Sequence, residues 1–444
     1  MNWDNLLSTK RTGELDSQIK SHDRTQFQRD FDRLIFSSPF RRMQDKTQVF
    51  PLPGSVFVHN RLTHSLEVAS VGRSLGNNIS KFLFEVKNET NELISELGAI
   101  TAAACLAHDM GNPPFGHSGE TAISHFFKHG EGKVYESEVN NPQIWSDFTN
   151  FEGNANAFRL LTHQFNGRRV GGFRMTYTTV ASIVKYPYAS GSSGLKKYGF
   201  FNSEEKTYHD VAQLLGIPKI STNPVQYARH PLVYLVEAAD DICYQVMDIE
   251  DAHKLGILSF ETTKDLLLNF FNDDVKYSNY LHEICETVTD KNEQIAFLRA
   301  NVIGKLVDLT SDVFIDNYDE IMAGTFNDSL IKKLAGEANV AMKKCIETGI
   351  NTIYCHPSVV EVEISGFKIL GTLLREFTKA VINPKDEYAG LLLPFMPLQY
   401  KVGADASISD KIQAVLDFIS GMTDVYALDL YRKINGIGLA DKRF

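Results

Sequence analysis

Cysteine is scarce in this 444-residue chain, which has five. They lie far apart, and none forms a C-x-x-C pair: Cys105, Cys243, Cys285, Cys345 and Cys355. An odd number of cysteines without paired spacing argues against a disulfide framework and indicates a reducing compartment. The same scarcity argues against a structural zinc site, which usually has cysteine ligands.

Long apolar runs and excess basic charge are missing as well. No run approaches the roughly 18 apolar residues that a membrane-spanning helix needs, and the first residues, MNWDNLLSTKRTGELD, lack the apolar segment of a signal peptide. The formal net charge is -10. We therefore expect a cytoplasmic protein without membrane contact. An acidic chain is not a general nucleic-acid binder, so a polyanionic ligand would need a local basic cluster or a metal.

Helical periodicity is what the sequence does have. Apolar residues recur at helical spacing in the segments 24–36, 61–79, 91–107 and 231–251. Signals for β-structure are sparse: VEVEISGFKIL near 359–370 alternates partly and suggests a short strand or hairpin. A Gly/Ser-rich loop is expected at 188–199. The sequence predicts an all-α fold, a helical bundle with peripheral helical layers and at most a small β-hairpin.

The first candidate site residues end the apolar helix 91–107. His108 and Asp109 are consecutive, so they lie about 100° apart on a helix and both can face one ion at its end. His64 shares a helix face with apolar residues at offsets of four, seven and eleven, so its imidazole should point inward. Each of these features alone is also typical of a satisfied polar group in a core.

A pair of carboxylates, Asp240 and Asp241, lies inside the otherwise apolar helix 231–251. Burying an unpaired carboxylate is costly, so the pair needs a cation, a basic side chain or solvent. Asp240, Tyr244 and Asp248 follow one another at four-residue spacing and form a polar stripe. A solvated helix edge is the alternative, but the apolar rows on either side favour a functional site.

Two histidines and two aspartates suit a divalent ion of octahedral habit, with Mn²⁺, Mg²⁺, Fe²⁺, Ni²⁺ and Zn²⁺ as candidates. Such an ion acidifies a bound water and polarises a phosphoryl oxygen. After the bend at Pro113-Pro114, His117 and Glu120 lie three residues apart on one helix face. A histidine beside a carboxylate is a natural proton shuttle. The alternative is a helix start, capped by Ser118, with an uninvolved histidine.

Three segments together resemble the HD-domain deoxynucleoside triphosphate triphosphohydrolases, the dGTP triphosphohydrolase group: RLTHS (61–65), HDMGNPPFGHSGE (108–120) and EAADDICYQVMDIEDA (237–252). HDMGNPPFGH is specific to this group. The resemblance extends over most of the chain through four more segments: SSPFRRMQDKTQVF (37–50), NFEGNANAFRLL (150–161), SIVKYP (182–187) and ISGMTDVYALDLYR (419–432).

The resemblance implies a role for each matching residue. The metal ligands would be His64, His108, Asp109 and Asp240; Asp240 is preferred to Asp241 because Tyr244 and Asp248 follow it at the matching offsets. The catalytic pair near the α-phosphate would be His117 and Glu120. The sugar would be held by Gln48, Tyr244 and Asp248, with Arg61 on the phosphate or base side and Lys185 on the polyphosphate. Lys197 and Lys206 are further phosphate candidates, but GRRVGGF (167–173) departs from the pattern of the group.

The resemblance also implies an HD phosphohydrolase core over 1–260, with its motif region at 60–250. Residues 261–355 would be an added helical layer, and 356–444 a C-terminal helical region that completes the core and the oligomer contacts. Members are commonly oligomeric, often hexameric. Some respond to a regulatory nucleotide or to single-stranded DNA, which the acidic charge makes an unexpected partner here.

The expected reaction is metal-dependent hydrolysis of a deoxynucleoside triphosphate, dGTP by preference, to deoxynucleoside and tripolyphosphate. Two alternatives remain open. One is an HD phosphohydrolase that acts on nucleoside monophosphates or cyclic dinucleotides. The other is a nucleotide-sensing protein that has kept the fold and lost activity. A purely structural helical protein is disfavoured because its core would bury several unpaired carboxylates.

Overall fold

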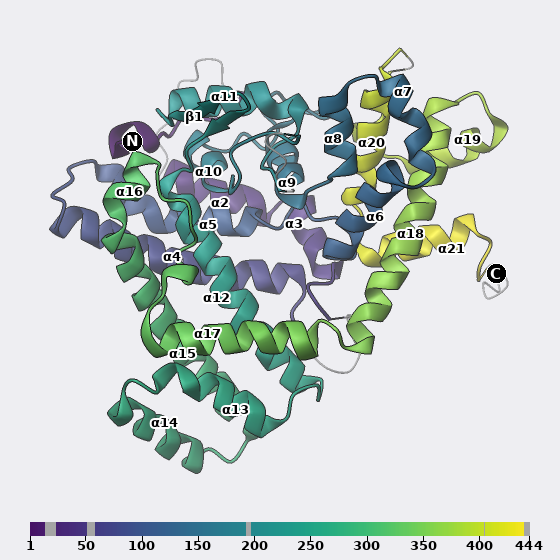
Figure 1. Cartoon of the computed structure of the whole chain (residues 1–444). Coiled ribbons are helices and arrows are strands. Elements are labelled where there is room, and N and C mark those ends of the chain that lie inside the picture. The colour runs from purple at the N-terminus through teal and green to yellow at the C-terminus, as the bar shows by residue number, and fades with distance from the viewer. Residues whose placement is uncertain (14–23, 51–57, 192–196, 404, 439–444) are drawn as a thin grey trace.

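The computed structural model describes residues 1–13, 24–50, 58–191, 197–403 and 405–438. Within these ranges it consists of α-helices and one antiparallel hairpin of β1 (Lys219–Thr222) and β2 (Val225–Tyr227) (Figure 1). The predicted all-α class is confirmed. Among the described helices, none combines the length and the apolar character that crossing a bilayer requires.

Three helices form the centre of the molecule: α4 (Arg61–Glu85), α5 (Leu97–Ala107) and α12 (Pro231–Lys254). They confirm the helices predicted at 61–79 and 231–251, and α2 (Gln26–Ile35) confirms the one at 24–36. The helix predicted at 91–107 is confirmed from Leu97 onward, whereas Glu92–Glu96 form a short 3-10 helix before it. Helices α4 and α5 pack closely because α4 has glycine at the contact. A Cβ at Gly72 would lie 2.5 Å from the Sγ of Cys105. This packing fixes the end of α5 beside the start of α4.

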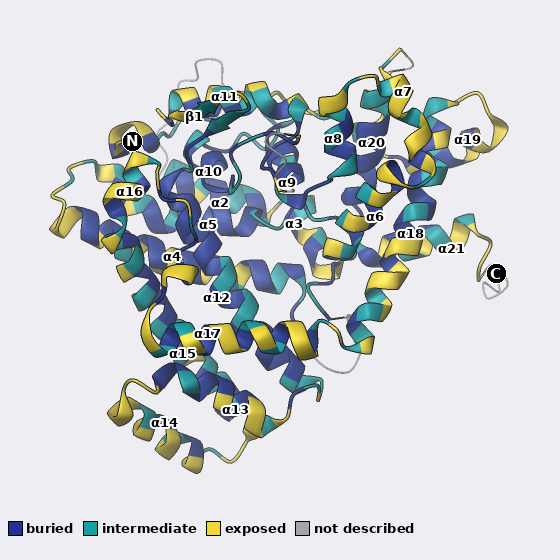
Figure 2. Ribbon diagram, in the orientation of Figure 1, coloured by how far each residue is buried: buried dark blue, intermediate teal, exposed yellow. Residues whose placement is uncertain are grey.

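A second helical layer lies beside this centre, with its own buried apolar cluster (Figures 1 and 2). It comprises α6 (Gly116–Lys128), α8 (Pro142–Thr149), α18 (Pro357–Ile382), α20 (Ile408–Ser420) and α21 (Asp424–Ile434). Three shorter helices follow α8 and precede α12 along the chain: α9 (Gly153–Thr162), α10 (Tyr177–Ser182) and α11 (Glu205–Leu214).

The prediction of a strand or hairpin near 359–370 is wrong, because this segment lies within the 26-residue helix α18. Pro357 occupies the first turn, and the side chain of His356 accepts a hydrogen bond from the Ser358 backbone N–H. Ile369, Leu370 and Leu373 are buried against the second layer. Helical burial of these later residues, rather than the partial alternation before them, decides the structure.

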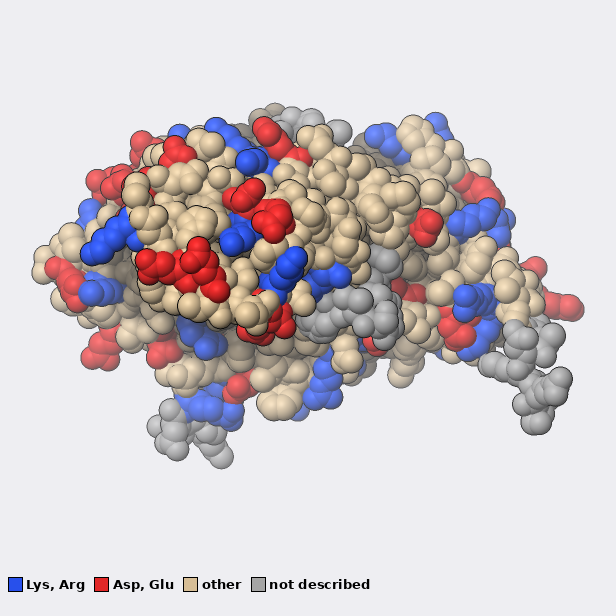
Figure 3. All heavy atoms as spheres, turned by 90° about the horizontal axis from the view of Figure 1, so that it is seen from below, with Lys and Arg blue, Asp and Glu red and all other residues tan. Residues whose placement is uncertain are grey.

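Residues 260–350 are helical, as expected. They form α13 (Phe260–Leu268), α14 (Val275–Thr287), α15 (Lys291–Asp316), α16 (Tyr318–Ala323) and α17 (Gly336–Thr348). Helix α15 packs along both α12 and α4. Acidic and basic side chains are interspersed over the face in Figure 3. The boundaries at 260 and 355 stay predictions. Of the expected loop at 188–199, residues 192–196 lie outside the described residues.

A buried ion cluster joins the layers through Arg159 of α9. Its Nε and Nη2 donate to the two carboxylate oxygens of Asp417 on α20, each at 2.8 Å, and Nη1 donates to Glu204. All three side chains are at most 6% exposed. Burial would raise the pKa of Glu204, but the Arg159 guanidinium and His163 lower it. Arg159 is therefore the permanent cation that both carboxylates share.

We expect Arg159→Leu to lower the free energy of unfolding by about 3–5 kcal/mol, since it leaves two buried carboxylates without their cation. Urea unfolding followed by circular dichroism measures this change. Arg375→Leu is the control: its pairs with Glu376 and Glu131 are partly exposed and should be worth about 1 kcal/mol or less. Equal losses in the two variants would contradict the prediction.

Candidate active site

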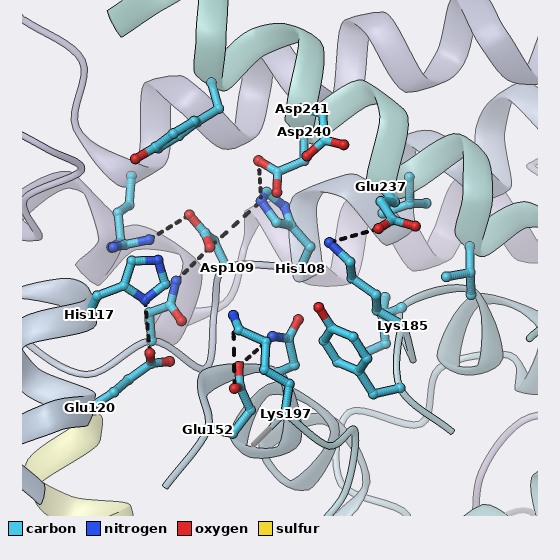
Figure 4. A pocket seen from close by; sticks show the side chains of 18 of the residues that line it. His108, Asp109, His117, Glu120, Glu152, Lys185, Lys197, Glu237, Asp240 and Asp241 are labelled. Carbon is cyan, nitrogen blue, oxygen red and sulfur yellow. Dashed lines mark hydrogen bonds and ion pairs between the residues drawn. The ribbon is translucent and has the colours of Figure 1, made fainter. Parts of the chain in front are cut away.

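Three central helices bring a cluster of histidine and aspartate side chains together, of which Figure 4 shows His108, Asp109 and Asp240. Helix α4 carries His64, α12 carries Asp240, and His108 and Asp109 follow directly after α5. The Nε2 of His64 lies 3.0 Å from Asp240 Oδ1, and the Nε2 of His108 lies 3.4 Å from the same oxygen. His108 Nε2 is also 3.6 Å from Asp109 Oδ1. Residues far apart in sequence thus meet at one point.

This cluster fits a divalent ion. His64, His108 and Asp109 each offer one donor atom, and these atoms all lie within 4.8 Å of one another. The Nδ1 of His108 lies 2.6 Å from the carbonyl oxygen of Cys105. A carbonyl only accepts, so Nδ1 carries a proton and Nε2 faces the cluster, where a divalent ion would take the place of the Nε2 proton. This orientation by a carbonyl is usual for a metal-binding histidine.

The charges in the cluster also favour a cation. Burial opposes protonation of His108, but the carboxylates of Asp109 and Asp240 raise its pKa to about 9. Burial would raise the pKa of Asp240, yet His108 and His64 hold it well below its usual value. For Asp241, burial raises the pKa to about 7 against the opposing effect of Lys185. The two adjacent aspartates therefore have different environments, and Asp240 is the one that contacts both histidines.

Asp109 is also held from outside the cluster. Its Oδ2 accepts from Nη1 of Arg61 at 2.7 Å, and its Oδ1 accepts from the side-chain amide of Asn112. Arg61 is the first residue of α4 and is 4% exposed. A Cβ at Gly116 would lie 2.5 Å from Arg61 Nη2, so the guanidinium fits beneath a glycine with φ +57°. Arg61 thus links the cluster to the start of α6.

The predicted pair of His117 and Glu120 lies on the first turns of α6. Glu120 Oε2 is 2.9 Å from His117 Nδ1, and Glu120 Oε1 accepts from the backbone N–H of Gly153 at 2.7 Å. The side chain of His117 is 75% exposed. Its hydrogen bond to Glu120 raises its pKa, although partial burial opposes this. Glu120 thereby fixes the ring and favours the imidazolium, which leaves Nε2 for a ligand.

One cavity of about 200 Å³ is lined by most of the predicted site residues. They are Gln48, Arg61, His108, Asp109, His117, Glu120, Lys185, Asp240 and Tyr244. His64 lies behind the lining, 1% exposed. Lys197 lines the cavity, whereas Lys206 is exposed on α11 and outside its lining. The cavity thus joins the His/Asp cluster to the His117–Glu120 pair.

Asp248 differs from the other predicted sugar contacts because it does not line this cavity. It is 5% exposed, and its Oδ2 accepts from the hydroxyl of Tyr354 at 2.8 Å. Burial raises its pKa to about 8. The rings of Tyr354 and Tyr244 are 5.9 Å apart. Sequence reasoning missed Tyr354, since only packing of the turn after α17 brings it to α12.

Other lining residues were also missed. Glu237 lies three residues before Asp240; its Oε1 is 3.0 Å from Lys185 Nζ and its Oε2 accepts from Arg229 at 2.8 Å. The available signal was that Glu237 is a further carboxylate in the apolar part of the helix that carries Asp240 and Asp241. Glu152 lies 4.0 Å from Lys197. It lies in NFEGNAN, a segment that contributes to the family resemblance but for whose side chains the sequence predicts no role. The remaining unassigned polar or aromatic lining residues are Asn112, Asn154, Ser182 and Tyr186.

Comparison with known proteins gives two family matches. Residues 61–182 match the HD domain, and residues 336–433 match the phosphohydrolase-associated domain. The first match holds His64, His108, Asp109, His117 and Glu120, while the second holds Tyr354 and α21.

Three relatives align with nearly the whole of this chain. A deoxyguanosinetriphosphate triphosphohydrolase-like protein of Synechocystis sp. is 38% identical, over 99% of this chain and 100% of that protein. A protein of Pseudomonas aeruginosa with the same description is 36% identical, over 98% and 99%. The deoxyguanosinetriphosphate triphosphohydrolase of Yersinia enterocolitica is 28% identical, over 92% and 93%.

Proposed function

Because this chain belongs to the family of HD-domain deoxyguanosinetriphosphate triphosphohydrolase-like proteins, we propose that it hydrolyses deoxynucleoside triphosphates, preferably dGTP, and so controls their pools. The products are deoxynucleoside and intact tripolyphosphate. The observation that carries this proposal is the shared cavity: the His117–Glu120 pair opens onto the same space as the His/Asp cluster. A proton donor and a site for a divalent ion can therefore act on one phosphate.

His64, His108, Asp109 and Asp240 would hold the ion, with Mn²⁺ or Mg²⁺ as first choices and Ni²⁺, Fe²⁺ or Zn²⁺ as others. When bound, such an ion supplies Lewis acidity and lowers the pKa of a bound water. A water oxygen would form the new bond to the α-phosphorus as the bond from phosphorus to the 5′-oxygen breaks, and the proton that this water loses would pass to solvent, from which His117 is reprotonated. Protonated His117 donates its Nε2 proton to that leaving oxygen, while Glu120 stabilises the imidazolium.

Other lining residues would orient the substrate. Arg61 would contact the phosphate or base side and Lys185 the polyphosphate; carboxylates, Asp109 and Glu237, hold the two cations at the cavity. Gln48 and Tyr244, which both line the cavity, would contact the sugar. Asp248 would act on the sugar by way of Tyr354, its hydrogen-bond partner. A tyrosine at the 2′ position of the sugar disfavours a ribonucleotide.

The test is to incubate the purified protein with dGTP, and with all four dNTPs, in Mn²⁺ or Mg²⁺, and to identify the phosphorus products by ³¹P NMR. We expect deoxynucleoside and tripolyphosphate. Monophosphate with pyrophosphate, or orthophosphate alone, would contradict cleavage between the α-phosphorus and the 5′-oxygen. Tight binding of dNTPs without any product would favour the nucleotide-sensing alternative.

The test includes a mixture of all four dNTPs because we also propose that a regulatory nucleotide can activate the enzyme. A second cavity, of about 680 Å³, supports it: five arginines line it, and there is no Asp or Glu among the described residues of its lining. They are Arg33, Arg42, Arg168, Arg169 and Arg174. This local basic cluster could bind triphosphate despite the acidic net charge. We also propose that the protein forms a homo-oligomer, of which a hexamer is one form. We do not propose single-stranded DNA as a partner.

Glu120→Gln should move the alkaline limb of the kcat profile to lower pH. Glu120 raises the pKa of His117, so the imidazolium that acts as acid persists to higher pH in the natural protein. Activity falls as pH rises through that pKa, and the fall comes earlier when the carboxylate is gone. The measurement is kcat from about pH 6 to about pH 10. Glu131→Gln, at an exposed carboxylate, should leave the limb in place; an unmoved limb in Glu120→Gln would refute the assignment.

A further inference from the structure

The closing motif ISGMTDVYALDLYR (419–432) takes no part in the site described above, yet one of its side chains binds two segments of the active centre. Asp424, the first residue of α21, is 7% exposed. Its Oδ2 accepts from the backbone N–H of Thr47 at 2.8 Å, and its Oδ1 accepts from the backbone N–H of Phe115 at 3.0 Å. One carboxylate therefore joins positions that are 377 and 309 residues away in sequence.

Lys46 connects the same three segments, but as a hydrogen-bond donor, whereas Asp424 is an acceptor. Its ammonium is buried, 3% exposed, and donates to the carbonyl oxygens of Asn112 at 2.6 Å and Ser420 at 2.8 Å. Its own carbonyl oxygen accepts from the backbone N–H of Arg61 at 3.2 Å. Asp424 accepts from two N–H groups, and the ammonium of Lys46 donates to two carbonyls. Together they hold the segments 46–47, 112–115 and 420–424 against one another, and we call this pair of residues the clamp.

Each clamped position adjoins a residue of the site. Thr47 precedes Gln48, and the side chain of Asn112 holds Asp109. Phe115 comes two residues before His117 and adopts the left-handed conformation, φ +63°, that starts α6. From the other side, α18 fixes this turn, since a Cβ at Gly366 would lie 2.6 Å from the Cβ of Phe115.

We propose that Asp424, with Lys46, is a positioning residue through which the C-terminal region sets His117 against the reacting phosphate. The inference rests on the proposed function for the role of His117. Glu120 is anchored on α9 by Gly153, so a shift of the turn at 112–115 moves His117 relative to the rest of the cavity. A misplacement of about 1 Å can cost on the order of 100-fold in rate.

The test compares Asp424→Asn with Asp429→Asn, which alters an exposed carboxylate of the same helix that pairs with Lys433. In Asp424→Asn the uncharged amide cannot accept from both N–H groups. We expect kcat to fall about 10–100-fold, with KM within about threefold and bound metal unchanged. Asp429→Asn should match the natural protein. An Asp424→Asn protein that folds, holds metal and keeps its kcat would overturn the proposal.

A double-mutant cycle separates positioning of His117 from a general structural role. If Asp424 acts through His117, Asp424→Asn adds no further loss in a His117→Ala background. Losses that multiply would overturn the proposal. Should Asp424→Asn fail to fold, Lys46→Met removes the other half of the clamp, and the same cycle with His117→Ala decides.

Hydrogen–deuterium exchange tests the role of Asp424 without any measurement of turnover. If the natural protein hydrolyses no dNTP, the proposed function fails, while the clamp is still measurable at the Phe115 amide. Peptides that cover 111–117 should exchange faster in Asp424→Asn and not in Asp429→Asn. Unchanged exchange in Asp424→Asn would show that the clamp does not order this turn, and would overturn it.

Discussion

Replacing His117 by alanine is expected to lower kcat about 10²–10⁴-fold, the usual contribution of a positioned general acid, without loss of bound metal. The reason is geometric: His117 lies on α6, outside the His/Asp cluster, and its Nδ1 contacts Glu120. Removing its ring deletes the proton donor and leaves His64, His108 and Asp109 in place. The measurements are kcat for dNTP hydrolysis and metal content by elemental analysis.

His125→Ala is the matched control for this variant. His125 lies on the same helix, is exposed, and its ring packs 5.0 Å from that of Phe367. It does not line the active-site cavity. We expect its kcat within about twofold of the natural protein, in keeping with surface substitutions generally. If His117→Ala turned over as fast as His125→Ala, the assignment of the acid would be wrong.

Asp240→Asn should have the other large effect, loss of both metal and turnover. Asp240 Oδ1 lies within 3.4 Å of Nε2 of both histidines, so the substitution removes a charged donor at the centre of the cluster. Metal affinity should fall by more than the roughly 10–100-fold that loss of an outer-shell partner costs. Isothermal titration with Mn²⁺ measures this directly, in the absence of substrate.

The adjacent Asp241→Asn is the discriminating control, because it changes the same chemical group one position along α12. Asp241 lines the cavity, but the histidine contacts belong to Asp240. It should therefore retain Mn²⁺ affinity. Saturating metal should also raise the Tm of the natural protein and of Asp241→Asn, and not that of Asp240→Asn. Equal metal affinity in the two variants would contradict the choice of Asp240.

Much of the site was predictable from sequence because its residues lie on strongly periodic helices. The apolar rows of α4, α5 and α12 fix which face of each helix is buried, and so which way His64 and Asp240 must point. A charged or polar group on a buried face then requires a partner. The structure brings His64, His108, Asp109 and Asp240 together, and it opens His117 onto the same cavity.

Local pattern failed where packing between distant segments decides the outcome. Val360, Val362 and Ile364 alternate like a strand, but the segment is helical because later residues of α18 bury their apolar face against the second layer. The partners of Glu237 and Asp248 were likewise hidden, since Lys185, Arg229 and Tyr354 reach them from other parts of the chain.

By itself, the sequence determined the helical class, the central helices and the chemical identity of the cluster, because periodicity and the cost of burying charge act over a few turns of one helix. The family resemblance already favoured Asp240 over Asp241, but only the tertiary structure placed its carboxylate against both histidines and brought Tyr354 to Asp248. It also showed that Asp424 joins the C-terminal region to the turn before His117. These contacts span 106 to 309 residues, a separation at which no local pattern constrains the distance between two side chains.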